Sequence, residues 1–130
     1  MSEYTVVKVR DVPDQGPNLG IAGGYELRFL RDDLGCENCG VTYTRLAPGF
    51  KQPFGHAHKR QEEIYLLVSG SAQMKLGDDV VELEPWTAVR VPPQTMRSLR
   101  ALDEGAEFVV IGAPNTGPGD GEIVRGWWAD

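Results

Sequence analysis

The only histidines of this 130-residue chain, His56 and His58, are separated by one residue, and Glu63 follows five positions later. Residues i and i+2 of a β-strand point to the same side, so both imidazoles would face one space. A short turn after His58 would bring the Glu63 carboxylate into that space. Two imidazoles and one carboxylate are the ligand set typical of Fe(II), and Mn, Ni or Zn also accept it. The spacing therefore predicts a divalent metal site at these three residues.

The elements that would position this site are short alternating runs of apolar and polar residues, bounded by turn residues. These runs cover residues 4–9, 25–30, 41–47, 62–68, 71–76, 80–84, 87–91, 96–101 and 106–111. No window keeps a 3.6-residue apolar period, so no long helix is expected. Many short strands with tight turns predict one antiparallel sandwich or barrel.

Composition excludes several classes of partner. The 13 Lys and Arg residues against 19 Asp and Glu residues give a net charge of −6, which argues against binding to nucleic acid or to an anionic membrane. No apolar run approaches the roughly 20 residues that a spanning helix needs, and the first residues lack the pattern of a signal peptide. We therefore expect a cytoplasmic protein whose partner is a small molecule.

The residues around the histidines resemble the first motif of the cupin superfamily, which runs Gly, His-x-His, Glu, Gly. The matching positions are Gly49, His56, His58, Glu63 and Gly70. The resemblance covers about residues 40–111. It implies an all-β fold, the double-stranded β-helix or jelly-roll barrel of the cupins, with the site at the barrel mouth.

The resemblance also implies how the rest of the chain is organised. Residues 1–130 would form a single cupin domain with its core at about 40–112. An N-terminal strand and the tail containing Trp127 and Trp128 would pack on this core. Small cupins commonly pair through their sheets, so the resemblance implies a homodimer, for which the apolar run 4–9 is suited.

The second cupin motif is altered in this chain. Trp86 and Gln94 stand where the motif has glycines, and Arg97 stands where it has a third metal-binding histidine. The resemblance therefore implies His56, His58 and Glu63 as metal ligands. It supplies no fourth ligand, because a guanidinium has no lone pair to offer.

Arg97 allows two interpretations, and both stay open at this point. In the first, the three ligands hold a metal, and Arg97 binds a substrate carboxylate or phosphate with paired hydrogen bonds. In the second, no metal binds, and Arg97 forms an internal ion pair with Glu63. The histidines would then bind a ligand directly or exchange protons near neutral pH.

Two classes of function follow from these interpretations. The first is a metal-assisted enzyme that acts on a small anionic or polyhydroxylated substrate, with no catalytic residue assigned. Arg97, Tyr65 and Phe54 are its predicted substrate-binding residues, since Phe54 and Tyr65 alternate in phase with the metal ligands. The second is a non-catalytic, metal-free binding or sensor module.

Other chemistry-bearing residues have plainer interpretations. Lys51, Lys59 and Arg60 flank the histidines and would steer an anion, but neighbouring residues on a strand cannot both face inward. For Lys59 and Arg60 we therefore favour solvated side chains. Cys36 and Cys39 form a lone C-x-x-C pair, which is half of a zinc site, so we interpret it as an incidental turn.

Overall fold

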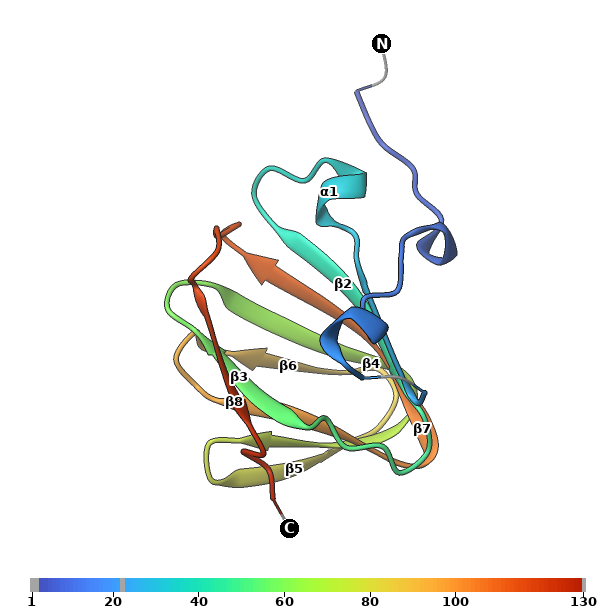
Figure 1. The fold of residues 1–130 in the computed structure, drawn as a ribbon, viewed down its shortest axis with the longest axis vertical. Coiled ribbons are helices and arrows are strands. Elements are labelled where there is room, and N and C mark those ends of the chain that lie inside the picture. The colour runs from blue at the N-terminus through green and yellow to red at the C-terminus, as the bar shows by residue number, and fades with distance from the viewer. Residues whose placement is uncertain (1–2, 22, 130) are drawn as a thin grey trace.

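Antiparallel β-strands dominate the computed structural model, which describes residues 3–21 and 23–129 (Figure 1). The strands are β1 (Tyr25–Phe29), β2 (Gly40–Leu46), β3 (Phe54–His58), β4 (Glu62–Leu76), β5 (Asp79–Leu83), β6 (Thr87–Val91), β7 (Arg97–Ala113) and β8 (Gly121–Arg125). The helices are the single turn α1 (Arg31–Leu34) and the 3₁₀ turns Val9–Asp11 and Pro17–Leu19. Among the residues described, no helix has the length and apolar character needed to cross a membrane.

The strands form one antiparallel sheet that curls on itself. Its order is β1-β2-β7-β3-β8, and β4 pairs with β5, β6 and β7. The two longest strands, β4 and β7, run alongside each other, with register shifts between Leu67 and Ala72 where the pair bends. Gly70 lies at this bend with φ 87°, and a Cβ there would collide with the carbonyl group of Gly105. Only glycine fits such a position.

Alternation along the strands builds the interior. Tyr65 and Leu67 of β4 point inward and are almost fully buried, whereas Ile64 between them is 41% exposed. The core cluster continues through Leu46, Met74, Leu99 and Phe108. The predicted all-β, double-stranded β-helix fold is therefore the fold observed.

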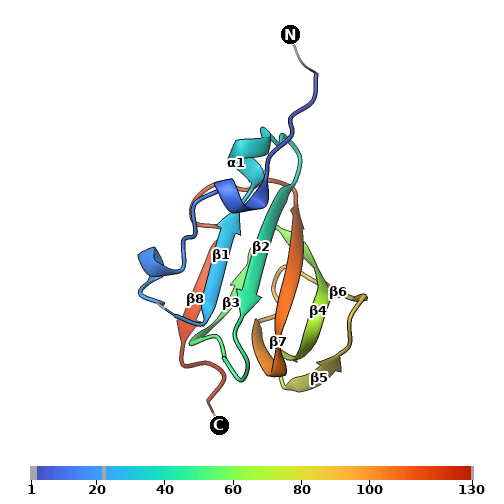
Figure 2. The same cartoon turned by 90° about the vertical axis from the view of Figure 1, so that its right-hand side faces the viewer.

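The N-terminal segment differs from the predicted strand. Residues 5–8 pair with no strand, and Tyr4 and Val6 are 77% and 82% exposed. In Figures 1 and 2 this segment extends away from the rest of the chain, at the end of the molecule opposite the C-terminus. An alternating run forms a strand only beside another strand, because the ladder satisfies its backbone groups. Parts of the expected single domain, residues 1, 2, 22 and 130, lie outside the described residues.

The C-terminal tail lies against the barrel. β8 pairs with β3 over its whole length. Beyond it, the Trp127 ring packs on Gly55, and the Lys75 ammonium lies 4.5 Å from the centre of that ring. Trp128 is 8% exposed. The two tryptophans thus anchor the tail beside the strand that carries both histidines.

Candidate metal centre

Strand β3 presents its two histidines to the interior of the barrel. Its residues alternate between two faces, with Phe54, His56 and His58 on one and Gly55 and Ala57 on the other. The second face is closed, since a Cβ on Gly55 would lie 2.5 Å from the Trp127 ring. The glycine in the sequence Phe-Gly-His-Ala-His therefore lets the tail close over the outer face of β3.

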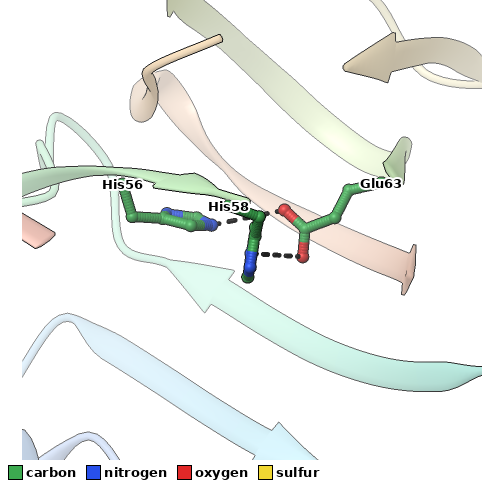
Figure 3. Close-up of side chains that lie close together, drawn as sticks. All are labelled: His56, His58 and Glu63. Carbon is green, nitrogen blue, oxygen red and sulfur yellow. Dashed lines mark hydrogen bonds and ion pairs between the residues drawn. The ribbon is translucent and has the colours of Figure 1, made fainter. Parts of the chain in front are cut away.

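The two imidazoles and the Glu63 carboxylate turn toward one another, as Figure 3 shows. His56 Nε2 lies 3.2 Å from Glu63 Oε1, and His58 Nε2 lies 3.6 Å from Glu63 Oε2. One ligand atom from each residue lies within 4.8 Å of the others. We call these three residues the His–His–Glu cluster. The structure therefore brings together the three residues that the sequence predicts as metal ligands.

The Glu63 carboxylate is kept ionised by its neighbours. Burial alone would raise the pKa of Glu63, but the contacts with His56, His58 and Tyr65 hold it far below its ordinary value. The Tyr65 hydroxyl donates to Oε1 at 2.9 Å. Burial and the Glu63 charge raise the pKa of Tyr65 well above its ordinary value, so this hydroxyl keeps its proton. An ionised, buried carboxylate is therefore available as a ligand.

His58 is oriented by Asp120, which the sequence analysis did not identify. Asp120 Oδ2 lies 3.0 Å from His58 Nδ1, and both carboxylate oxygens also accept backbone N–H bonds, from Arg60 and Gln61. Burial would raise the pKa of Asp120, but these backbone bonds lower it. An ionised carboxylate only accepts hydrogen bonds, so Nδ1 of His58 carries the proton. The signal for Asp120 was its place in a Gly-Asp-Gly turn just before the alternating run of β8.

The free nitrogen of His58 fits a metal ion. Its Nε2 is buried and finds no hydrogen-bond partner among the described residues. Glu63 raises the pKa of His58, although burial and Arg97 oppose the shift, so a proton binds this nitrogen when no metal competes for it. Atoms bound about 2.1 Å from one ion lie roughly 3.0–3.5 Å apart, close to the observed spacings. A histidine held by a carboxylate through its second nitrogen is a common metal-ligand arrangement.

Arg97 lies in the barrel wall behind Glu63. Its side chain is fully buried, with Nη1 3.4 Å from Glu63 Oε1 and Nη2 donating to the Pro92 carbonyl at 2.8 Å. It is not among the residues that line the cavity. The guanidinium therefore touches the carboxylate from the side opposite the free space, and Oε2 stays turned toward His58.

A cavity of about 780 Å³ opens in front of the cluster. Phe54 and Tyr65, the other predicted substrate-binding residues, both line it. Lys51, Lys59 and Arg60 do not. The cavity walls are therefore largely apolar and aromatic, and polar side chains such as Thr42, Gln52 and Asn115 line them besides the His–His–Glu cluster.

The altered second motif contains a left-handed backbone conformation. Trp86, in place of a glycine, has φ 67° in the left-handed region, and its N–H donates to the Leu67 carbonyl at 2.6 Å. The side chain is 73% exposed. A residue with a side chain therefore adopts a left-handed conformation here, which carries a conformational cost.

Comparison with solved structures places this architecture among known folds. No family model matches the sequence, and no curated protein matches it. A cupin protein from Bacteroides fragilis is similar at 24% identity and a TM-score of 0.73, over 90% of this chain and 89% of that one. KdgF from Halomonas sp. is similar at 18% identity and a TM-score of 0.68, over 89% of this chain and 96% of that one.

A larger enzyme contains the same architecture. Oxalate decarboxylase from Bacillus subtilis is similar at 20% identity and a TM-score of 0.76, over 94% of this chain. The match spans 33% of that enzyme, about one third of its length. With these neighbours and the curled antiparallel sheet, the chain has the cupin fold, as the resemblance of its first motif predicted.

Proposed function

We propose that this protein binds a divalent metal, Fe, Mn, Ni or Zn, on His56, His58 and Glu63 and uses it on a small-molecule substrate. The observation that carries the proposal is the buried, unpartnered Nε2 of His58, whose ring is fixed by Asp120 and faces the Glu63 carboxylate. A buried polar nitrogen without a hydrogen-bond partner costs stability unless something binds there. A cation relieves both groups at once.

The position of Arg97 leaves the space in front of the cluster open to a metal. A guanidinium inside the cavity would repel a divalent ion, but this one lies in the wall and holds Glu63 through Oε1. We propose Arg97 as a positioning residue for Glu63. Arg97 would then affect a substrate only by holding the Glu63 carboxylate in place. Phe54 and Tyr65 are proposed to contact the substrate directly, since both line the cavity.

The bound metal would supply Lewis acidity or redox chemistry with O₂. The chain's own residues do the rest. Asp120 holds one proton on Nδ1 of His58 and so turns Nε2 toward the metal, Tyr65 donates to Glu63, and the largely apolar cavity walls would surround the substrate. We propose the substrate class expected from the sequence, which is a small anionic or polyhydroxylated molecule.

The second candidate is a metal-free binding or sensor module. Its supporting observation is the contact between the fully buried Arg97 and Glu63 at 3.4 Å, which supplies a positive partner without any metal. In that case the two histidines would bind the ligand by hydrogen bonds.

Metal content measured by mass spectrometry after equilibrium dialysis separates the two candidates. The metal-assisted proposal expects one ion per chain in the wild type and in Glu62→Gln, and at least about 100-fold weaker binding in Glu63→Gln. Glu62 is a matched control, since it is the adjacent, exposed carboxylate that pairs with Arg90. Wild-type protein that retains none of the four metals would refute the proposal and leave the metal-free module.

We also propose a cytoplasmic homodimer. The exposed side chains of Tyr4 and Val6 and the lack of a strand partner for residues 5–8 support pairing with a second copy. Cys36 and Cys39 are unpaired, which suits a reducing compartment. Sedimentation of the full chain and of Val6→Lys tests the assembly: the variant is expected to shift toward the monomer.

A further inference from the structure

The walls of the cavity in front of the His–His–Glu cluster are largely apolar. The apolar residues that line it include Leu27 of β1, Phe54 of β3, and Leu99 and Val110 of β7. Its volume of about 780 Å³ lies in the range that holds a drug-sized ligand. A space this large and this apolar suits a ligand with a substantial carbon body.

Three large apolar side chains at the cavity are also exposed to solvent. Leu19, Phe29 and Ile123 all line the cavity, and they are 42%, 51% and 63% exposed. They come from three separated parts of the chain, which the fold brings to the same cavity. Apolar side chains gathered at the edge of a cavity indicate a surface that an apolar ligand covers.

The charges at the cavity favour one negative charge on that ligand. The charged lining residues are Glu63 and the pair Arg31 and Asp32, whose Nε and Oδ1 atoms lie 3.1 Å apart and offset each other. Behind the lining, the charges of Arg97, which contacts Glu63, and of Asp120, which contacts His58, also offset each other. A divalent ion beside Glu63 would therefore leave the site with a net charge of about +1, since the two histidines are neutral as ligands. A single carboxylate or similar anionic group balances that charge.

We infer that the ligand of this site is a monoanionic amphipathic molecule, with one anionic group at the His–His–Glu cluster and an apolar or aromatic body against the cavity walls. The inference rests on the proposed metal site for its charge and on the cavity lining for its body. It selects the anionic class over the polyhydroxylated one, because most of the wall is apolar and would strip water from hydroxyl groups. The polar lining side chains Thr44 and Gln52 already hydrogen-bond within the protein, which leaves fewer partners for a ligand with many hydroxyl groups.

Calorimetric titration of the full chain loaded with Mn(II) tests the inference with three probes. These are 1-naphthylacetate, its neutral analogue 1-naphthylacetamide, and gluconate, a polyhydroxylated monoanion. We expect naphthylacetate to bind at least about tenfold more tightly than either of the others, since each lacks one of the two recognised features. Gluconate binding as tightly as naphthylacetate would overturn the inference.

A matched pair of variants locates the binding. Ile123→Ser removes an exposed apolar side chain from the cavity, and Ile64→Ser makes the same change on the outer face of β4, where the residue is 41% exposed. We expect Ile123→Ser to weaken naphthylacetate by about tenfold and Ile64→Ser to leave it unchanged. Equal effects of the two variants would contradict a ligand in the cavity.

Failure of the proposed function is distinguishable from failure of this inference. If the protein binds no Mn(II), the proposed function fails, and the expected preference for the acid over the amide fails with it. The predicted contact between the ligand's apolar body and the cavity walls can still be tested. The neutral amide must then bind the wild type more tightly than it binds Ile123→Ser. If Mn(II) binds and naphthylacetate does not, the inference alone is wrong.

Discussion

The substitution Asp120→Asn tests how the barrel prepares His58 to bind a metal. Asp120 Oδ2 faces both His58 Nδ1 and the Gln61 N–H, while Oδ1 accepts the Arg60 N–H. Asparagine has one acceptor oxygen and one donor NH₂ group. If its oxygen stays on the Arg60 N–H, its NH₂ group faces His58 Nδ1, which must then accept, and the proton moves to Nε2. That proton occupies the position of the metal.

We expect this variant to bind metal about 10- to 100-fold more weakly, the usual effect of removing a group that orients a metal ligand. Competition with a chelating dye measures the affinity, and the far-ultraviolet circular dichroism spectrum checks that the fold is retained. Asp79→Asn, at an exposed carboxylate outside the site, is the control and should match the wild type. A folded Asp120→Asn protein with wild-type affinity would refute the role assigned to Asp120.

Four further predictions concern stability. Arg97→Met should lower the free energy of unfolding by roughly 3–5 kcal/mol in urea, because it leaves a buried carboxylate without its cation; an unchanged midpoint would rule the ion pair out as a stabilising contact. Trp86→Gly should raise the free energy of unfolding by about 1 kcal/mol by relieving a left-handed conformation, and a loss would argue against that strain. Gly55→Ala should lower the free energy of unfolding by about 1–3 kcal/mol, and by much less in a Trp127→Ala background. Equal losses in both backgrounds would contradict the close packing of the Trp127 ring on Gly55. In metal-free protein, the raised pKa of His58 stabilises the fold below about pH 6.5, and this stabilisation is lost as the pH rises through the raised value. His58→Gln should remove that pH dependence, measured by urea titrations at about pH 6 and about pH 8.5. If the variant keeps the pH dependence, another group causes it.

Most of the barrel could be predicted because its strands alternate strongly. The runs 25–30, 41–47, 80–84 and 87–91 correspond to β1, β2, β5 and β6 within one or two residues. The runs on either side of Gly70 are one continuous strand, β4, because the chain bends through a bulge without leaving the sheet. A turn residue and a bulge residue look alike in sequence, and only the pairing with β7 distinguishes them.

The cluster could be predicted from spacing alone, but the groups around it could not. His56, His58 and Glu63 lie close in sequence, so strand alternation and one turn bring them together. Asp120 approaches His58 from 62 positions away, across a tail whose glycines and prolines suggested irregular structure. The burial of Arg97 behind Glu63 depends on the packing of β7 against β3, which no local pattern encodes. The strand β8 was not predicted either, because the glycines and prolines of the same tail suggested irregular structure.

The central claim is that His56, His58 and Glu63 hold a metal together. Anomalous diffraction at the manganese edge, from crystals of the full chain grown with Mn(II), tests it most directly. We expect one strong peak within bonding distance of a nitrogen from each histidine and an oxygen of Glu63. Crystals that contain Mn(II) elsewhere, or none, while the three side chains keep their ordered contacts with one another, would contradict it.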